Sequence, residues 1–307
     1  MKVFLAGETP MSKDAGWARD VEGWQTGALA SVIKRRLYSY YYHGFNKGNR
    51  LDREVEVARD AGMELFLDSG AFSAFTQKET IPLEQYADFI NKHGSIFSVV
   101  ANMDDIGDTG PKSWANLKAL EAMGCKVFPV FHHADTMDFL DRILAEGYEF
   151  MALGGLVGAG RAVLRDWLDG VWHAKLTNPD GTPKIKVHGF GLTDFELMMR
   201  YPWYSVDSSS WVMAGIFGGC VFIERGKLFK VVFSDDSPAL KEPNSWHYAS
   251  LAPAQQKKVD EWLAPMGVTA AQCAAHYSFR HLVNATTYQS MESLGTDKFI
   301  LEQETLF

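Results

Sequence analysis

Short hydrophobic runs rich in β-branched and aromatic residues alternate with longer amphipathic stretches over residues 1–211. A parallel sheet produces this alternation, because each buried strand is followed by a helix that covers it. The runs lie at residues 3–6, 37–42, 64–67, 96–102, 126–131, 150–153, 185–190 and 203–206. These eight runs match the strand number that closes a (β/α)8 TIM barrel, the α/β fold class that we predict. An open doubly wound sheet would show the same alternation and remains the alternative fold.

Helical spacing occupies the gaps between the runs and dominates the end of the chain. The predicted helices cover residues 83–93, 113–123, 140–144, 253–265 and 269–294. Residues 220–224 and 228–233 flank the turn Arg225-Gly226-Lys227 and predict a hairpin. We therefore expect a barrel core over residues 1–215. A C-terminal hairpin and helical appendage over residues 216–307 should pack on it as part of a single structural unit.

The composition is that of an ordinary globular protein. Hydrophobic residues make up 47% of the 307 positions and charged residues 22%, which argues against disordered and fibrous classes. The longest uncharged apolar run, residues 211–223, is shorter than the ~20 residues of a bilayer span, so we expect no membrane association. The first residues resemble a strand more than a signal peptide, and three widely spaced cysteines predict no disulfide framework. We expect a cytoplasmic location, in the host cytoplasm if a phage encodes the protein.

The formal net charge of −8 counts against a protein that is held on nucleic acid by phosphate contacts over its whole surface. Phosphate contacts would have to come from local basic clusters, although each of these is better explained as a solvated surface charge. The candidates are Lys34-Arg35-Arg36, Lys227, Lys230, Lys257-Lys258 and Arg280. The hairpin near Arg225 is favoured, because it follows closely on the last predicted barrel strand.

Polar residues follow most of the predicted strands, at the end where barrel enzymes place their active sites. Three of them are carboxylates, Asp68, Asp104 and Asp207, after the third, fourth and eighth runs. Neighbouring carboxylates push one another's pKa values apart, so that one can act as a nucleophile and another as an acid. Such a set suits glycosidic chemistry that passes through a covalent sugar intermediate. Each aspartate alone is also compatible with a helix N-cap.

Histidines and glycines complete the set of candidates. His132 and His188 follow the fifth and seventh runs, either as substrate ligands or as satisfied interior histidines. Gly154-Gly155 follows the sixth run, where it makes a tight turn and lets a flat ligand approach the backbone.

A metal-dependent barrel hydrolase is a rival hypothesis. Its oxygen and imidazole ligands would be Asp104, Asp105, Asp108, His132 and His133. No HxH pair follows the first strand, and no CxxC pair exists. We therefore predict neither a metal nor a cofactor.

Six segments in order resemble motifs of the tRNA-guanine transglycosylase superfamily, the queuine tRNA-ribosyltransferase-like enzymes. Asp68-Ser69-Gly70-Ala71-Phe72 resembles the DSGG(F/Y) motif of that family, and Met103-Asp104-Asp105 resembles its FDE segment. The other four are residues 128–132 (FGIVQ in the family), 152–156 (GGL), 188–191 (MGVG) and 205–208, which resembles the segment with the aspartate nucleophile. The matches run from about residue 64 to 211 and look most like the phage and bacterial DNA-modifying branch, called DpdA.

This resemblance implies a base-exchanging glycosyltransferase (a pentosyltransferase) that replaces guanine in DNA with a 7-deazaguanine such as preQ0. It implies that Asp207 attacks C1′ of the nucleotide and that Asp68 is the general acid and base. The residues implied to bind the base are Ser69, Gly70, Phe72, Asp104, His132, Gly154, Gly155 and His188. Phe72 and His188 would sandwich the purine by stacking. DNA and the deazaguanine base are thus the expected partners, with no prediction of an oligomeric state.

The chain departs from the tRNA enzymes in two ways. It lacks their CxCxxC…H zinc motif, since Cys273 with His276 or His281 is at most a remnant. It also has His132 and His188 where they usually have Gln and Met. These departures favour DNA and leave tRNA-guanine exchange as the closest alternative. A non-catalytic transglycosylase-like subunit that binds nucleic acid is a further hypothesis, against which the three carboxylates argue.

Overall fold

The computed structural model describes residues 1–7, 28–45, 55, 57–107, 110–192, 194–241 and 246–300. Each of the eight predicted runs overlaps a strand of one parallel sheet, whose order is β4-β3-β2-β1-β8-β7-β6-β5. The strands are β1 (Lys2–Leu5), β2 (Arg35–Ser39), β3 (Glu64–Asp68), β4 (Val99–Val100), β5 (Val130–His132), β6 (Phe150–Gly154), β7 (Lys186–Gly189) and β8 (Ser205–Ser208).

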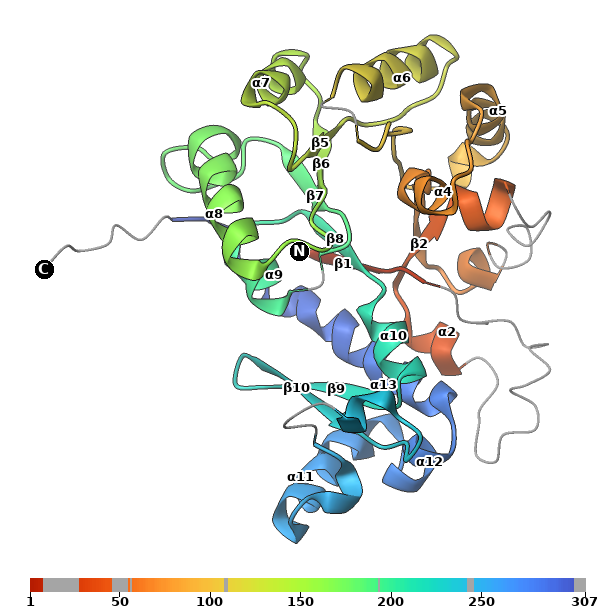
Figure 1. Ribbon diagram of the computed structural model, residues 1–307, viewed down its shortest axis with the longest axis vertical. Coiled ribbons are helices and arrows are strands. Elements are labelled where there is room, and N and C mark those ends of the chain that lie inside the picture. Colours follow the sequence, from red (N-terminus) through yellow and green to blue (C-terminus); the bar gives the residue numbers. More distant parts are fainter. Residues whose placement is uncertain are drawn as a thin grey trace, which may run out of the picture.

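The sheet is curled, so that its two edge strands approach each other. A parallel bridge joins Ala101, next to β4, to Phe128, close to β5. Figure 1 shows helices of the α4 to α9 series around the outside of these strands. The fold is therefore α/β, with a curled sheet of eight parallel strands that is compatible with a TIM-like barrel.

Helices follow the strands in the amphipathic stretches. They are α2 (Ala28–Val32), α4 (Ala71–Gln77), α5 (Leu83–His93), α6 (Pro111–Ala122), α7 (Met137–Ala145), α8 (Arg161–Val171) and α9 (Phe195–Arg200). α5 has the predicted bounds, and it buries Tyr86, Ala87 and Ile90 on one face. Among the described residues, no helix combines the length and apolar character that crossing a membrane requires.

The second strand begins earlier than its hydrophobic run. β2 starts at Arg35 and ends at Ser39, and a π-helix, η1 (Tyr41–Phe45), follows it. The hydrophobic pattern did not show the start of this strand, because its first two residues are charged. Arg35 is nevertheless accommodated because it pairs with Glu64 on β3 at 2.8 Å, and Arg36 is fully buried.

The inside of the curled sheet is filled by apolar side chains. This interior cluster comprises Phe4, Ala6, Leu37, Phe66, Ala101, Phe128, Val130 and Ala152. Phe66 joins opposite sides, since its ring centroid lies 5.3 Å from Phe4 and 5.7 Å from Phe128. The interior is therefore a packed core and not a pore, and polar side chains at the carboxyl ends of the strands lie on an apolar floor.

Beyond β8, helix α10 (Ser210–Ile216) leads into an antiparallel hairpin of β9 (Gly219–Glu224) and β10 (Lys227–Val232). Arg225 and Gly226 at its turn have positive φ angles of 50° and 70°, as a two-residue type I′ turn requires. The helices α11 (Pro253–Leu263), α12 (Ala270–Ala275) and α13 (Tyr277–Ser290) follow. The hairpin shares a second apolar cluster with them, which includes Cys220, Phe222, Val231, Leu263, Cys273 and Val283.

α13 is polar in sequence but mostly buried, because its side chains hydrogen-bond the backbone of its neighbours. Asn284 is 0% exposed, and its amide nitrogen donates to the carbonyls of Trp211 at 2.9 Å and Gly219 at 3.2 Å. Its carbonyl oxygen accepts from the Val221 N–H at 2.8 Å. One side chain thereby joins α10, β9 and α13.

Gln289 makes a similar connection between α13 and the sheet. Its amide nitrogen donates to the Val3 carbonyl at 2.8 Å, and its oxygen accepts from the Lys34 N–H at 2.7 Å. These bonds place the end of α13 beneath the first two strands. The sheet and the C-terminal helices are thus connected through buried polar contacts.

Three of the arginines that we named as candidates for phosphate binding instead make hydrogen bonds or ion pairs within the protein. Arg36 is 0% exposed and donates to a backbone carbonyl. Arg280 is 6% exposed and donates to the Gly215 carbonyl at 2.7 Å. Arg35 is engaged by Glu64 and Glu292. Phosphate contacts by these residues are therefore wrong as predictions, because long-range partners that the sequence does not show occupy the guanidinium groups.

We predict that Asn284→Ala lowers the free energy of unfolding by about 2–4 kcal/mol, because it removes the side-chain partner of the buried Val221 N–H and of the Gly219 carbonyl. Denaturant unfolding measures the change. The control is Asn91→Ala, which removes an exposed hydrogen bond to Met123 and should change stability by about 0.5 kcal/mol or less. Equal effects of the two substitutions would contradict the central role of Asn284.

Candidate active site

The three predicted carboxylates meet at the carboxyl ends of the strands. Asp68 ends β3, Asp104 follows β4, and Asp207 lies within β8. Asp207 and Asp104 are close enough to Asp68 for their negative charges to raise its pKa. The structure therefore brings together all three members of the predicted set.

Asp207 is held by one oxygen. Its Oδ1 accepts from the Gly191 N–H at 2.8 Å and lies 3.2 Å from His188 Nε2. Among the residues that the structure describes, none hydrogen-bonds to Oδ2. The side chain is 9% exposed. Asp207 therefore has one anchored oxygen and one that is left to react.

His188 contacts Asp207 from the buried side of the site. It is 0% exposed, and its Nδ1 lies 2.8 Å from Ser205 Oγ. If Ser205 donates to Nδ1 and Nε2–H donates to Asp207, then all three groups are satisfied. The rings of Phe66 and Phe190 lie 4.6 and 4.7 Å from the imidazole. Stacking of His188 on a base, as implied by the resemblance, is therefore wrong for this structure, because no face of the ring is open.

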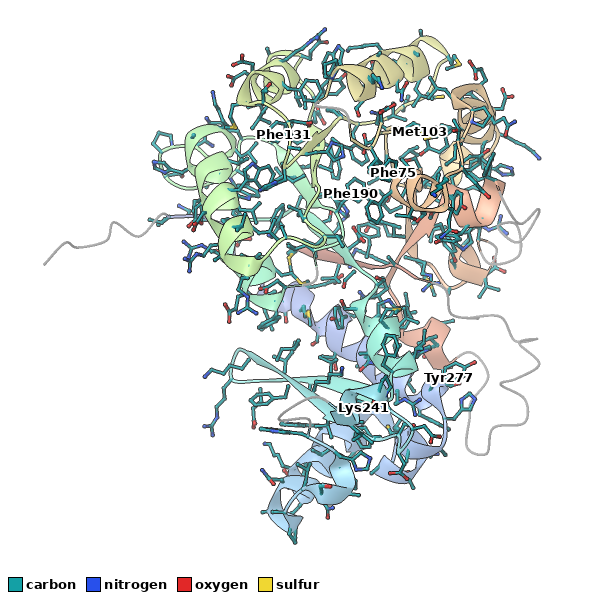
Figure 2. The ribbon with its side chains drawn as sticks, viewed as in Figure 1. Phe75, Met103, Phe131, Phe190, Lys241 and Tyr277 are labelled. Carbon is teal, nitrogen blue, oxygen red and sulfur yellow. The ribbon has the colours of Figure 1, made fainter. Side chains whose placement is uncertain are left out.

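Phe190 is a more suitable aromatic surface, and the sequence did not single it out. It lies two residues after His188 and is half-buried, with its ring stacked on Phe128 at 6.4 Å. Figure 2 shows Phe190 and Phe75 toward the middle of the curled sheet in that view. The signal was the alternation of strand side chains, which puts residues i and i+2 on the same face.

The turn after β3 presents a second aromatic surface. Gly70 has a φ of 74°, and a Cβ there would lie 2.3 Å from Ser39 Oγ and 2.4 Å from Tyr41 Cβ, so only glycine fits. α4 starts directly after it and exposes Phe72 by 58%. The ring of Phe72 is thus open to a ligand, which is compatible with the stacking role that the resemblance implies for it.

Phe75 is also 58% exposed, three residues further along α4. Residues three apart share one helix face, so the two phenylalanines form an aromatic edge next to Asp68. Ser69 has a different position from the predicted base-binding one. It is 2% exposed, and its Oγ faces the Ala71 N–H at 3.4 Å, which makes it part of the turn.

Among the described residues, Asp68 is hydrogen-bonded by backbone N–H groups and by no side chain. The Gly70 N–H donates to its Oδ2 at 3.1 Å, and the Ser69 backbone N–H also bonds this carboxylate. Loss of hydration, together with the negative charges of Asp207 and Asp104, raises the pKa of Asp68 to about 7. At neutral pH this carboxyl can both give and accept a proton, as a general acid and base must.

Asp104 belongs to a charged cluster with His132 and Asp135. His132 Nε2 lies 3.2 Å from Asp104 Oδ2, and its Nδ1 lies 3.5 Å from Asp135 Oδ2. Burial by itself would lower the pKa of His132, but the two carboxylates outweigh it and raise this pKa to about 10. His132 is therefore an imidazolium at neutral pH. Both nitrogens face carboxylates, so it orients Asp104, and the predicted direct hydrogen bond to the base is not supported.

Two further residues complete this cluster, and the sequence did not indicate them. Asp135 accepts the His132 N–H at 2.7 Å and has a fully buried side chain. Asn102 Nδ2 lies 3.3 Å from Asp104 Oδ1 and donates to the Ser113 carbonyl at 2.8 Å. Asp104 is therefore approached on one oxygen by an imidazolium and on the other by an amide.

The glycine pair after β6 makes room for His132. A Cβ on Gly154 would lie 2.6 Å from His132 Cδ2, so a larger residue would displace the ring. Gly155 has a φ of 72° and an exposed backbone. The structure thus gives Gly154 a packing role and leaves the Gly155 backbone open to a ligand.

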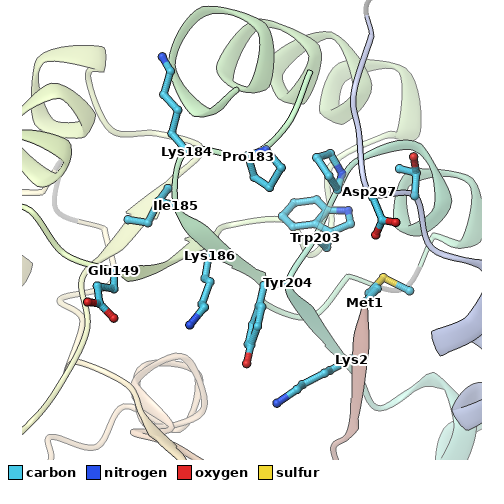
Figure 3. A pocket seen from close by; sticks show the side chains of 12 residues that line it. Met1, Lys2, Glu149, Pro183, Lys184, Ile185, Lys186, Trp203, Tyr204 and Asp297 are labelled. Atoms are coloured by element: carbon cyan, nitrogen blue, oxygen red, sulfur yellow. The ribbon is translucent and has the colours of Figure 1, made fainter. Parts of the chain in front are cut away.

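A cavity of about 650 Å³ lies at the other end of the sheet (Figure 3). Its lining includes Met1, Lys2, Glu149, Lys186 and Tyr204, at the amino ends of strands. Lys2 pairs with Glu64 at 2.6 Å. We place the reaction at the carboxyl ends, because three interacting carboxylates, one with a strongly raised pKa, occur there.

The rival metal site is not assembled in the described residues. No group of three or more His, Cys, Asp or Glu side chains with a metal-binding arrangement occurs among them. Asp105 faces Lys112 at 3.7 Å, and His133 packs 5.1 Å from Trp167. Asp108 lies outside the described residues.

Comparison with known proteins does not place the chain in a family. No family model matches it, and no curated protein does either. A functional assignment therefore depends on the geometry of the site.

We predict that the contribution of His132 to stability depends on pH. Its folded pKa of about 10 lies above its ordinary value of 6.5, so the contribution is complete below pH 6.5 and disappears as the pH rises through 10. The stability difference between the wild type and His132→Gln should therefore shrink by about 2–4 kcal/mol from pH 6 to pH 10. Denaturant unfolding at several pH values measures it.

The matched control is His173→Gln, which changes an exposed histidine on the surface. Its effect on stability should be small at every pH. A difference for His132→Gln that stays constant from pH 6 to pH 10 would refute the imidazolium between two carboxylates.

Proposed function

We propose that this chain is a (β/α)8-barrel transglycosylase that exchanges guanine in DNA for a 7-deazaguanine of the preQ0 type, through a covalent bond between Asp207 and the nucleotide. The observation that carries the proposal is the pairing of two different carboxylates. Asp207 has one anchored oxygen and one free oxygen, and Asp68 beside it has a pKa of about 7. A nucleophile and a proton carrier are the two groups that a retaining exchange needs.

The proposed reaction has two symmetrical halves. Asp207 Oδ2 attacks C1′ of the deoxyribose, the C1′–N9 bond breaks, and its electron pair stays on the departing guanine. Protonated Asp68 gives its proton to that base. An incoming 7-deazaguanine then returns its N9 proton to the Asp68 carboxylate and attacks C1′, which releases Asp207. Protons and charges balance over the cycle, and no metal or cofactor takes part.

Recognition of the base is assigned to Asp104. Guanine and 7-deazaguanines both present N1–H and an exocyclic N2 amine, which a carboxylate can accept together. Imidazolium His132 and the Asn102 amide orient Asp104 for this role. Phe72 and Phe190 supply the aromatic surfaces against which the flat base would stack. Adenine lacks this donor pair and would be rejected.

A test of the function is the incorporation of labelled preQ0 into duplex DNA and, separately, into unmodified tRNA. We expect incorporation into DNA by the wild type, none by Asp207→Ala, and turnover lowered about 10²- to 10⁴-fold by Asp68→Asn, because only proton transfer is removed. Asp105→Asn is the control, since this neighbour faces Lys112 and should leave activity unchanged.

Each alternative has its own outcome in that experiment. Incorporation into tRNA alone would keep the mechanism and change the substrate. An Asp207→Ala variant that still forms a trapped covalent adduct would refute the nucleophile. No incorporation into either nucleic acid, with binding retained, would favour the non-catalytic subunit. Activity that requires an added metal would favour the hydrolase.

A second prediction concerns the coupling between the two carboxylates. Asp207→Asn removes a negative charge beside Asp68, so the ionised form of Asp68 becomes easier to reach and its pKa should fall from about 7 by about one unit. Carboxyl ¹³C NMR titration measures the pKa directly and requires no activity. Asp105→Asn should leave it in place, and an unchanged value in Asp207→Asn would show that the two groups do not interact.

A further inference from the structure

Four aromatic rings form a continuous row along the hairpin and α11. Phe222 stacks on Trp262, with ring centroids 4.9 Å apart and planes 29° apart. Phe229 lies 6.1 Å from Trp262 and 6.1 Å from Trp246, each time with a 31° tilt. The first ring is buried, the middle two are half-buried, and Trp246 is 45% exposed. The row therefore ends in an indole that is open to solvent.

Uncompensated positive charge lies at the same hairpin. Within the ranges that the structure describes, Arg225, Lys227 and Lys230 are exposed and have no acidic side chain within ion-pair distance. Glu224, the one acidic residue of the two strands, pairs at 2.8 Å with Lys258. In a chain of net charge −8, this hairpin is locally basic.

Lys227 and the aromatic row lie on the same face of the hairpin. Side chains alternate along β10, so Lys227 and Phe229 point to one side and Lys230 to the other. Lys258 extends this arrangement, because its ammonium lies 5.8 Å over the Trp262 ring. We call the group of Arg225, Lys227, Phe229, Trp246 and Trp262 the hairpin surface.

We propose that the hairpin surface binds an unpaired stretch of DNA, with a base stacked on Trp246 and phosphates beside Arg225 and Lys227. Flat rings for bases and cations for phosphates are the combination that single-stranded nucleic acid requires. Binding here does not depend on the base exchange, and only the choice of DNA over RNA rests on the proposed function.

The hairpin surface is distinct from the strand ends. β9 is joined through α10 to β8, which carries Asp207, and Figure 1 shows the hairpin beside α11 and α13, away from the other barrel strands. A strand bound there would be held by the protein outside the reaction site. The hairpin surface therefore adds affinity without touching the reacting base.

The test is binding of a fluorescent dT12 oligonucleotide to the full chain, followed by anisotropy at several salt concentrations. This probe contains no guanine, so its binding is independent of base exchange. We expect Trp246→Ala and Lys227→Glu each to weaken binding about tenfold. Loss of the Lys227 contact should also reduce the slope of log K against log[salt] by about 0.7.

Matched controls separate this surface from general effects. Lys92→Glu reverses an exposed charge on α5, and Ile300→Ala removes an exposed apolar side chain; both should bind dT12 as the wild type does. Asp207→Asn should also bind it normally. Thermal unfolding verifies that Lys227→Glu and Trp246→Ala remain folded.

Three results would overturn the proposal. The first is no binding of dT12 by the wild type, and the second is equal weakening by Lys227→Glu and Lys92→Glu. The third is a preference for rU12, or for vesicles that contain phosphatidylserine, which would assign the hairpin surface to RNA or to an anionic membrane. Failure of preQ0 incorporation with dT12 binding intact would refute the proposed function alone.

Discussion

Three carboxylates share one partly buried opening at the end of the sheet, and their mutual repulsion is the constraint around which the site is built. Two of them receive strong support. Asp207 has the Gly191 N–H and His188, whereas Asp104 has imidazolium His132 and an amide. Among the described residues, Asp68 has only the backbone N–H groups of Ser69 and Gly70, and it is the carboxylate whose pKa rises to about 7. Because the three carboxylates have different hydrogen-bond and charge partners, three identical functional groups become chemically different.

The partners of the three carboxylates also explain which parts of the site were predictable from the sequence. The aspartates follow hydrophobic runs, and runs that are parallel strands end at the same place, so their convergence could be predicted. Asp135, Asn102 and Ser205 could not be predicted, because each acts through a contact that only the folded chain creates. A sequence pattern encodes the position of a residue along its strand. It does not encode which residue of another strand or loop will be the partner of that side chain.

The fold shows the same division. The eight strands follow from periodicity, but the start of β2 was hidden because Arg35 and Arg36 are charged. Spacing predicted helices at the C-terminal end, but the single helix predicted over residues 269–294 is interrupted at His276, between α12 and α13, and the buried polar face of α13 was not predictable. Asn284 has a polar side chain of a type that usually lies at the surface. Its burial is explained by its hydrogen bonds to backbone groups of α10 and β9. Asp68 and Asp207, which the resemblance to transglycosylases singled out, lie at the carboxyl ends of β3 and β8, but the stacking role that it implied for His188 is excluded by the full burial of that side chain.

The contacts of β1 determine the order in which the parts of this chain can fold. β1 lies in the middle of the sheet between β2 and β8, and Gln289 donates to the carbonyl of Val3, 286 positions earlier. During synthesis at the ribosome, β1 can pair early with β2, but it must wait about 200 residues for β8 and nearly 290 for Gln289. Such non-local pairing makes folding slow and leaves apolar strand surface exposed in the meantime. Production of this protein in cells should accordingly depend on chaperone capacity and on temperature more than its final stability would indicate.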